Sequence, residues 1–571
     1  MTDPPAEPVD AAGWGALGDR LRLEGDARGA DRAYVRQLRA DLTDPDLIAA
    51  ADALSADDAA TAHRLLSALL ARRPSDTAAL RMFADLAARS GRHHDAEILL
   101  ARCLNSAPQL AAARCAYALA LHQQGKSAET IAQTDILLRD DPHHPLYRQL
   151  RAAALMRIGE DAAAAEAYGA VLAAEPGLAL TWMGYAHALK TIGRREDAVA
   201  AYRESLRLRP ELGEAWWSLA NLKTVALGPA DIARMEDTLS GPALDEDDRF
   251  HLLFALGKAY EDTGAYARAF QCYANANALR HQSLDYEAEE TRLHVDRCKA
   301  LFSPSFFAGF AGGGSPRPDP IFIVGLPRSG STLIEQILAS HSLVEGTREL
   351  SDLEAMASRL GGHAARPSEG VYPDILAALS GAELHALGEE YLDRARVHRK
   401  TAAPFFIDKT PNNFAHLGLI QLILPNARII DARRHPVGCC FSAFKQHFAV
   451  GQAFTYSQED LARYYRDYVA LMAHFDAVLP GRVHRVIYEQ MVAEPEAQVR
   501  RLLAHCGLPF EDACLRFYEN PRPVRTASSE QVRMPIFADA TDHWRHFEPW
   551  LQPLMLGLGD VLEAYPDAPD V

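Results

Sequence analysis

Proline and glycine recur through the first half of the 571-residue sequence at a fixed interval of 34 residues. The positions that define this interval form two series: Pro74, Pro108, Pro142, Pro176 and Pro210, and Gly91, Gly125, Gly159 and Gly193. Proline ends a helix, whereas glycine tolerates the positive φ that a tight turn between two helices requires. A single helical hairpin cannot bury its apolar face, so the repeat predicts a stack of hairpins, an α-solenoid.

Small and bulky apolar residues occupy equivalent places within the repeats. Around Gly193 they fall at helical spacing: Trp182, Leu189, Ala198 and Tyr202. The pattern resembles tetratricopeptide repeats (TPR) and extends over residues 11–295, with an irregular insertion near residues 228–248. The resemblance implies a concave surface that holds an extended peptide or a protein partner. A scaffold or dimerisation arm that touches no substrate is the alternative, and a homodimer stays open.

The charge and the cysteine pattern exclude several classes of protein. With 59 Lys and Arg against 76 Asp and Glu, the formal net charge is −17, which argues against non-specific binding to nucleic acid or anionic membranes. An anionic ligand would therefore need a locally basic pocket. Eight cysteines without a CxxC pair or zinc-type His/Cys spacing predict neither a disulfide framework nor a metal site. The sequence starts without a signal-peptide pattern and has no apolar run of membrane-spanning length, so we expect a cytoplasmic protein.

A different pattern begins after residue 295. Residues 296–318 are predicted to be a linker, because they contain the consecutive glycines Gly312–Gly314 and lead into the alternating prolines Pro316, Pro318 and Pro320. The apolar run Ile321–Val324, a glycine-containing loop and an amphipathic helix follow. A buried strand, a loop and a helix N-terminus in this order direct backbone N–H groups at an anion. We therefore predict an α/β domain with a mainly parallel sheet over residues 319–571, which opens on a phosphate-binding loop.

The loop Gly325–Thr332, GLPRSGST, departs from the nucleoside-triphosphate loop because Ser331 stands where that loop has lysine. Arg328 supplies a planar cation instead, which suits a single phosphate or sulfate group. The segment PRSGSTLIEQIL resembles the 5′-phosphosulfate loop of sulfotransferases that use 3′-phosphoadenosine 5′-phosphosulfate (PAPS). With the repeats in front, the chain resembles the bacterial TPR sulfotransferases. The resemblance implies that the loop residues bind the donor: Arg328, Ser329, Gly330, Ser331 and Thr332.

A second donor-binding segment follows the apolar strand predicted around Ile429–Asp431. Arg434 stands at the end of this strand, and Ser442 lies eight residues on. A dianion needs at least one arginine and a hydroxyl or amide donor. In the sulfotransferase pattern, an Arg and a Ser at this separation hold the 3′-phosphate of PAPS. Arg433 is interpreted as a solvated neighbour.

The tyrosylprotein sulfotransferases, which the second half resembles, indicate catalytic groups. Glu349 matches their proposed general base, and Lys409 matches the lysine that they direct at the leaving oxygen. The same resemblance implies that residues nearer the C-terminus contact the donor or the transferring group: Tyr488, Ser528, Ser529 and Arg533. Each has a structural alternative, which is a helix-start carboxylate for Glu349, a loop lysine for Lys409, and packing or turn residues for the others.

The expected function is a sulfotransferase that needs no metal and transfers the sulfuryl group of PAPS to a hydroxyl. A tyrosine of a peptide or protein is the favoured acceptor, and carbohydrate, lipid or small-metabolite hydroxyls are the alternatives. Two other classes stay open. An atypical phosphate-loop kinase would need a carboxylate that holds Mg²⁺, for which Asp431 is a candidate. A TPR scaffold with an inactive nucleotide domain would bind the donor without turnover.

Overall fold

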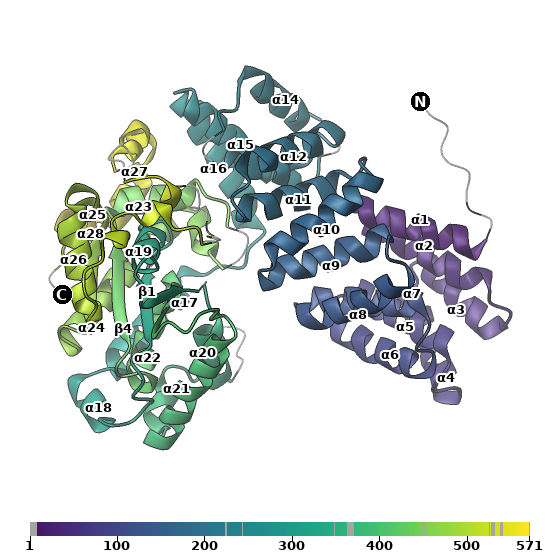
Figure 1. Ribbon diagram of the computed structural model, residues 1–571, viewed down its shortest axis with the longest axis horizontal. Helices are drawn as coiled ribbons and strands as arrows, with labels where there is room; N and C mark the ends of the chain where they lie inside the picture. Colours follow the sequence, from purple (N-terminus) through teal and green to yellow (C-terminus); the bar gives the residue numbers. More distant parts are fainter. Residues whose placement is uncertain are drawn as a thin grey trace. The chain divides into compact units, whose positions relative to one another are not determined.

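The chain divides into two compact units, Met1–Ala215 and Trp216–Val571, in the computed structural model (Figure 1). The residues that the structure describes are 8, 10–222, 225–241, 244–347, 349–362, 370–448, 451–522, 524, 526, 531–536 and 541–569.

The first unit is built of helical hairpins. Its helices are α1 (Ala11–Glu24), α2 (Ala27–Ala40), α3 (Pro45–Ser55), α4 (Ala59–Arg72), α5 (Thr77–Arg89), α6 (His93–Ser106), α7 (Ala111–Gln123), α8 (Ser127–Asp140), α9 (Pro145–Ile158), α10 (Asp161–Ala174), α11 (Ala179–Thr191) and α12 (Arg195–Leu208). Gly193 turns the chain between α11 and α12 with φ +81°, as the repeat pattern predicts. Ala198 on α12 has no exposed surface, so the small side chain lets the two helices approach. The predicted helical repeat is confirmed.

Helices of the repeat region continue into the second unit. They are α13 (Gly213–Ala220), which begins three residues before the division, and α14 (Pro229–Leu239), α15 (Glu246–Asp262), α16 (Tyr266–Gln282) and α17 (Ala288–Leu301). The irregular insertion of the sequence pattern coincides with the short helix α14. Helix α18 (Pro304–Gly309) lies within residues 296–318. The domain limits at residues 295 and 319 describe the organisation of the sequence and stay a proposal, since the division into compact units follows residue 215.

A five-stranded parallel sheet lies within the second unit. Its strands are β1 (Pro320–Gly325), β2 (Val344–Gly346), β3 (Phe405–Asp408), β4 (Arg428–Arg433) and β5 (Val483–Ile487), in the spatial order β2-β3-β1-β4-β5. The central strand β1 pairs with β3 through Pro320 and Phe406, and with β4 through Ile321 and Arg428. Every residue of β1 is buried, which agrees with its continuous apolar sequence.

Helices follow and cover the strands. They are α19 (Ser331–Leu338), α20 (Asp352–Leu360), α21 (Gly381–Arg396), α22 (Leu417–Ile423), α23 (Pro436–Phe444), α24 (Gln458–Val478), α25 (Tyr488–Ala493), α26 (Pro495–Cys506), α27 (Gln552–Leu558) and α28 (Asp560–Ala564). Ile337 and Leu338 of α19 share one hydrophobic core with Ile323, Ile407 and Ile430 of three strands. This packing fixes α19, and with it the loop that precedes it, against the sheet.

The repeat helices of the second unit are joined to the sheet region by polar contacts that are partly or fully buried. Lys445, just after α23, donates to both carboxylate oxygens of Glu261 on α15 at 2.8 and 2.9 Å. Asn277 on α16 donates to the carbonyl oxygen of Phe444 at 2.9 Å. Burial alone would raise the pKa of Glu261, but the ammonium of Lys445 outweighs it and holds that pKa below its usual range. Glu261 on α15 and Lys445 after α23 therefore compensate each other's charge.

This pair generates a prediction about stability. Glu261→Gln should lower the free energy of unfolding by about 2 to 3 kcal/mol, because the largely buried ammonium of Lys445 would lose its carboxylate partner. Glu496→Gln, which breaks an exposed pair with Arg500, should cost less than about 1 kcal/mol. Urea unfolding of the full chain measures both variants. Equal small losses would mean that the pair of Glu261 and Lys445 does not hold α15 to the sheet region.

Candidate active site

The parallel sheet brings the predicted site residues to one edge. All strands of a parallel sheet end at the same edge, where the loops that follow them meet. Each of the five strands is followed by a residue that the sequence singles out: Glu349 after β2, Lys409 after β3, Arg328 after β1, Arg434 after β4 and Tyr488 after β5. Residues up to 160 positions apart in the sequence therefore belong to one edge of one sheet.

The loop between β1 and α19 has the backbone that anion binding needs. Arg328 has φ +70°, and Gly330, which precedes the first residue of α19, has φ +96°. A Cβ on Gly330 would lie 2.6 Å from Cδ2 of Tyr488, so glycine is required there for space as well as for conformation. The side chains of Ser329, Ser331 and Thr332 are buried in this loop and the first turn of the helix.

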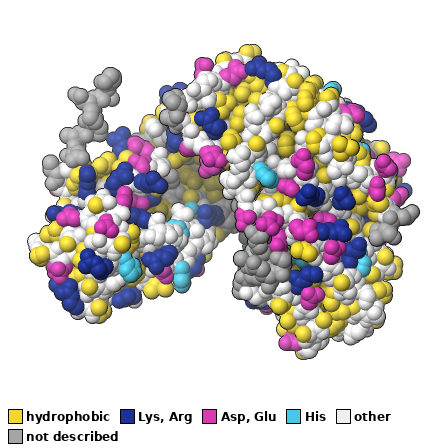
Figure 2. Space-filling model, turned by 180° about the vertical axis from the view of Figure 1, so that it is seen from behind, with side chains coloured by type: hydrophobic (Ala, Val, Ile, Leu, Met, Phe, Trp, Pro, Cys, Tyr) yellow, Lys and Arg dark blue, Asp and Glu magenta, His cyan; other side chains and the backbone are white. Residues whose placement is uncertain are grey.

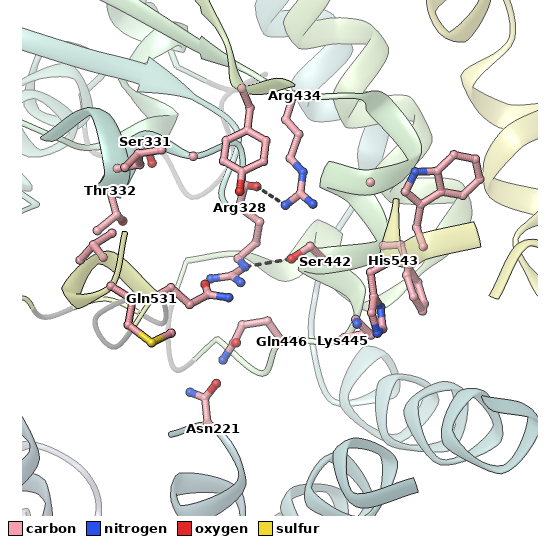
Figure 3. Close-up of a pocket in the computed structure, with 18 of the residues that line it drawn as sticks. Asn221, Arg328, Ser331, Thr332, Arg434, Ser442, Lys445, Gln446, Gln531 and His543 are labelled. Atoms are coloured by element: carbon pink, nitrogen blue, oxygen red, sulfur yellow. Dashed lines mark hydrogen bonds between the residues drawn. The ribbon is translucent and has the colours of Figure 1, made fainter. Parts of the chain in front are cut away.

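Two guanidinium groups meet beside this loop (Figure 3). Nε of Arg328 donates to Oγ of Ser442 at 3.1 Å, and Nη1 of Arg434 donates to the carbonyl oxygen of Arg328 at 3.4 Å. The guanidinium of Arg434 also lies 4.8 Å from the ring centre of Tyr488. Burial and the nearby charge of Arg434 lower the pKa of Arg328 to about 10. An anion between the loop and these two arginines would relieve their repulsion.

A cavity of about 420 Å³ opens beside the arginines. Four lysine or arginine side chains line it, against one carboxylate, that of Glu261, among the described residues: Lys258, Arg328, Arg434 and Lys445. Ser331, Thr332, Ser442 and Tyr488 line the same cavity. On the face of the molecule in Figure 2, by contrast, acidic and basic side chains are interspersed. Lys445 is paired with Glu261 and Lys258 with Asp262. Arg328 and Arg434 are therefore the lining cations that fit the basic pocket that an acidic chain needs for an anionic ligand.

Sequence reasoning missed Lys445 and Lys258. Lys445 follows Ser442 by three residues at the end of α23, which places the two on one face of a helix. This spacing could have indicated from the sequence that Lys445 lies near Ser442. Lys258 lies on the repeat helix α15. No local pattern indicates that a charged residue of a repeat helix lines a cavity beside a sheet.

Glu349 and Lys409 lie together at the other side of β1. The ammonium of Lys409, which is 2% exposed, contacts the carboxylate of Glu349, which is 56% exposed. The backbone N–H of Leu350 donates to Oγ1 of Thr410 at 3.0 Å and ties the loop after β2 to the loop after β3. Burial raises the pKa of the neighbouring carboxyl of Asp408 to about 7. Glu349 precedes α20 by three residues and so is not its first helical residue.

Four further residues of the sequence analysis either differ from its expectations or lie outside the described residues. Arg433 is not a solvated neighbour: it is 1% exposed and donates to Asp431 at 3.1 Å, because its side chain points into the core beneath the sheet edge. Arg533 donates to the carbonyl oxygen of Arg522 at 3.4 Å, and it is not among the residues that line the 420 Å³ cavity. Ser528 and Ser529 lie outside the described residues.

Neither a metal-binding group nor a membrane helix is found in the part of the chain that the structure describes. No cluster of three or more His, Cys, Asp or Glu side chains in that part is arranged to hold a metal ion. Among the same residues, no helix is both long and apolar enough to cross a membrane.

Comparison with known proteins identifies the two kinds of segment. Residues 320–512 match the sulfotransferase family, and residues 179–212 match the tetratricopeptide repeat. Residues 320–512 form a sulfotransferase-family domain. The family match covers β1 to β5 and the loops that carry Arg328, Glu349, Lys409, Arg434 and Tyr488.

Relatives are similar to parts of the chain. An uncharacterised protein of Aquifex aeolicus is 33% identical over 56% of this chain and 43% of its own length. Protein-tyrosine sulfotransferase 1 of Danio rerio is 28% identical over 39% of this chain and 65% of its own. The chain thus spans less than two thirds of each. Among solved structures, the sulfotransferase domain of the Synechococcus PCC 7002 olefin synthase is 22% identical, with a TM-score of 0.31 over 40% of this chain and 88% of that one.

The geometry of the loop generates a prediction about anion binding. Gly330→Ala should weaken the binding of sulfate or phosphate by at least about tenfold, because the new Cβ combines a strained φ with a collision against Tyr488. Gly481→Ala is the matched control, since Gly481 also has positive φ, +76°, but faces open space. The control should lower stability by about 1 kcal/mol and leave anion binding intact.

Thermal unfolding of both variants with and without the anion measures the effect. An anion-induced rise in Tm that is the same in Gly330→Ala as in the unmodified chain would contradict the loop as the binding site.

Proposed function

We propose that this protein is a PAPS-dependent sulfotransferase that sulfates a tyrosine hydroxyl of a peptide or protein. One observation carries the proposal. Two arginines that follow adjacent strands, Arg328 after β1 and Arg434 after β4, line one basic cavity beside a phosphate-type loop that lacks the triphosphate lysine. The sulfotransferase-family match of residues 320–512 supports this assignment.

The donor would bind through its two separate anionic groups. The loop Arg328–Thr332 and the first N–H groups of α19 would hold the 5′-phosphosulfate. Arg434 and Ser442 would hold the 3′-phosphate, with Tyr488 beside the guanidinium of Arg434. Lys445 and Lys258 line the same cavity, where Lys445 is paired with Glu261 and Lys258 with Asp262.

The reaction would be an in-line displacement at sulfur. The acceptor oxygen forms the new S–O bond while the bond from sulfur to the bridging oxygen of the 5′-phosphate breaks, and the nucleotide leaves with that oxygen. Glu349 would take the proton of the acceptor hydroxyl, and Lys409 would offset the negative charge that grows on the bridging oxygen. The ammonium of Lys409 and the carboxylate of Glu349 are in direct contact. This contact would hold the general base and the cation that stabilises the leaving group next to each other.

The surroundings of Asp431 favour sulfuryl transfer over phosphoryl transfer. A kinase would need a carboxylate that is available to Mg²⁺. Asp431 is fully buried and accepts hydrogen bonds from Arg433 at 3.1 Å and Arg485 at 3.0 Å, and from the hydroxyl of Tyr468. These contacts hold the carboxylate of Asp431 in the core, where it is not available to bind Mg²⁺.

Acceptors other than tyrosine are the alternatives within the same reaction. A carbohydrate, lipid or small-metabolite hydroxyl would meet the same donor and the same base. The TPR helices favour a peptide or protein acceptor, because stacked helical repeats present extended binding surfaces. The similarity to a protein-tyrosine sulfotransferase of Danio rerio points the same way.

The 3′-phosphate site can be tested by nucleotide binding. Adenosine 3′,5′-bisphosphate should bind about 10- to 100-fold more tightly than adenosine 5′-monophosphate, because charge-assisted contacts contribute about 1.5 to 3 kcal/mol each. Arg434→Ala should erase most of this difference. Arg500→Ala, which removes an exposed arginine of α26, should leave the difference unchanged. Calorimetric titration that gives equal affinities for the two nucleotides would refute the assignment.

The role of Glu349 can be tested by kinetics. Glu349→Gln should lower kcat by about 10² to 10⁴ because the base is lost, while the size of the side chain is kept. Donor affinity should stay the same, since Glu349 is not among the residues that line the basic cavity. Collapse of donor affinity, or a rate within a factor of a few of the unmodified chain, would assign Glu349 a structural role.

A further inference from the structure

Lys409 stands in the chain between two residues whose side chains form hydrogen bonds with each other. We propose that Asp408 and Thr410 are positioning residues, which keep this lysine in contact with Glu349. The inference rests on the proposed function, in which the lysine and the glutamate act together, and it names the groups that place the pair. Neither Asp408 nor Thr410 is among the described residues that line the cavity beside Arg328.

The hydroxyl of Thr410 joins the loop after β2 to the loop after β3. Its Oγ1 accepts a hydrogen bond from the backbone N–H of Leu350 at 3.0 Å. This N–H belongs to the planar peptide group that joins Glu349 to Leu350, so the contact fixes the backbone of Glu349 itself. The carbonyl oxygen of Thr410 accepts from the N–H of Asn413 at 2.9 Å, which holds Thr410 at the start of the 3₁₀ helix η3 (Pro411–His416).

A second hydrogen bond ties the same loop on the other side of Glu349. Oγ1 of Thr347 donates to the carbonyl oxygen of Ile407 in β3 at 2.5 Å. The side chain of Glu349 is 56% exposed, whereas that of Lys409 is 2% exposed. A side chain as exposed as that of Glu349 has little packing to restrict its rotamers, so the hydrogen bonds of its loop decide where it lies.

Asp408 sets the direction of the Thr410 hydroxyl. Oδ1 of Asp408 accepts from Oγ1 of Thr410 at 2.7 Å, whereas the carbonyl oxygen of Leu350 lies further from the same hydroxyl, at 3.2 Å. A hydroxyl has one proton, and an ionised carboxylate only accepts hydrogen bonds. The proton of Thr410 therefore faces Asp408, and a lone pair is left for the N–H of Leu350.

Two further donors hold the carboxylate of Asp408. The hydroxyl of Tyr391 on α21 donates to Oδ2 at 2.8 Å, and Nδ2 of Asn413 donates to the same oxygen at 3.4 Å. Asp408 and Tyr391 have no exposed surface. Burial raises the pKa of Asp408 to about 7, so the carboxyl is ionised above that pH. An apolar side chain would avoid the cost of burying a carboxyl, and the hydroxyls that Asp408 orients explain why a carboxyl is present.

Kinetics of the full chain at pH 8 test the positioning role. Thr410→Val removes the hydroxyl at nearly constant size and should lower kcat by about 10- to 100-fold, because a displaced base is no longer aligned with the acceptor. The KM for PAPS should change by less than about threefold, since Thr410 does not line the basic cavity. Thr410→Ser keeps the hydroxyl and should keep kcat within about threefold of the unmodified chain.

Two more variants complete the kinetic test. Asp408→Asn should lower kcat at least about fivefold, because an amide has one accepting oxygen where the carboxylate has two. Thr134→Val is the matched control. It removes a hydroxyl without exposed surface from α8 of the first unit, where Thr134 donates within its own helix, and it should leave kcat unchanged.

Chemical modification of Lys409 tests the same contact without turnover. Acetic anhydride acetylates lysine, and mass spectrometry of the digested chain follows each lysine over time. Lys409 should react slowly in the unmodified chain, because it is buried and paired with Glu349. Thr410→Val and Asp408→Asn should each raise its rate at least about fivefold, and Thr410→Ser should not. The rate at Lys445, which is paired with Glu261, should stay the same in all variants.

The two measurements separate this inference from the proposed function. An unchanged acetylation rate of Lys409 in both Thr410→Val and Asp408→Asn, or an equal rise at Lys445, would overturn the positioning role whatever the activity. A Thr410→Ser variant as slow as Thr410→Val would also overturn it. If the unmodified chain transfers no sulfuryl group, the proposed function fails, and the acetylation rates alone then decide whether Asp408 and Thr410 hold the contact.

Discussion

The parallel pairing of β1 with β3 on one side and with β4 on the other is the constraint on which the site depends. This register brings the ends of the three central strands to one edge, so Arg328, Lys409 and Arg434 follow neighbouring strands. The buried apolar core beneath them, which includes Ile323, Ile407 and Ile430, fixes that register. A shift by one residue would turn these side chains away from the core and misplace every loop at the edge.

The repeat helices of the second unit take part in the same arrangement. The pair of Glu261 and Lys445 joins α15 to the end of α23, and Lys258 of α15 lines the basic cavity beside Arg328. The residues before the sheet therefore have two roles in the proposed mechanism. Lys258 contributes to the lining of the basic cavity, and Glu261 fixes the position of Lys445 in the same lining.

The sequence predicts those features that have a local period or a local motif. The 34-residue interval predicts the hairpins around Gly193, and the order of strand, loop and helix predicts β1 and α19. Arg434 at the end of an apolar run predicts a residue at the sheet edge. By contrast, Arg433 is a core residue because its partners Asp431 and Tyr468 are buried with it. Tyr468 lies 35 residues further along the chain, so no local pattern in the sequence indicates this contact. A cavity of about 700 Å³ in the second unit likewise has no local pattern in the sequence, because the residues that line it come from separate segments, which include the start of α17 and the loop before α20.

The most direct test of the account is the identity of the group that the full chain transfers. A tyrosine-containing peptide is incubated with PAPS labelled with radioactive sulfur, and in a parallel reaction with ATP labelled in its γ-phosphate. Each reaction is run with and without a chelator of divalent metal ions. The account predicts that radioactive sulfur reaches the peptide in both conditions and that no phosphate does. Transfer of phosphate that the chelator abolishes, with no transfer of sulfur, would contradict it.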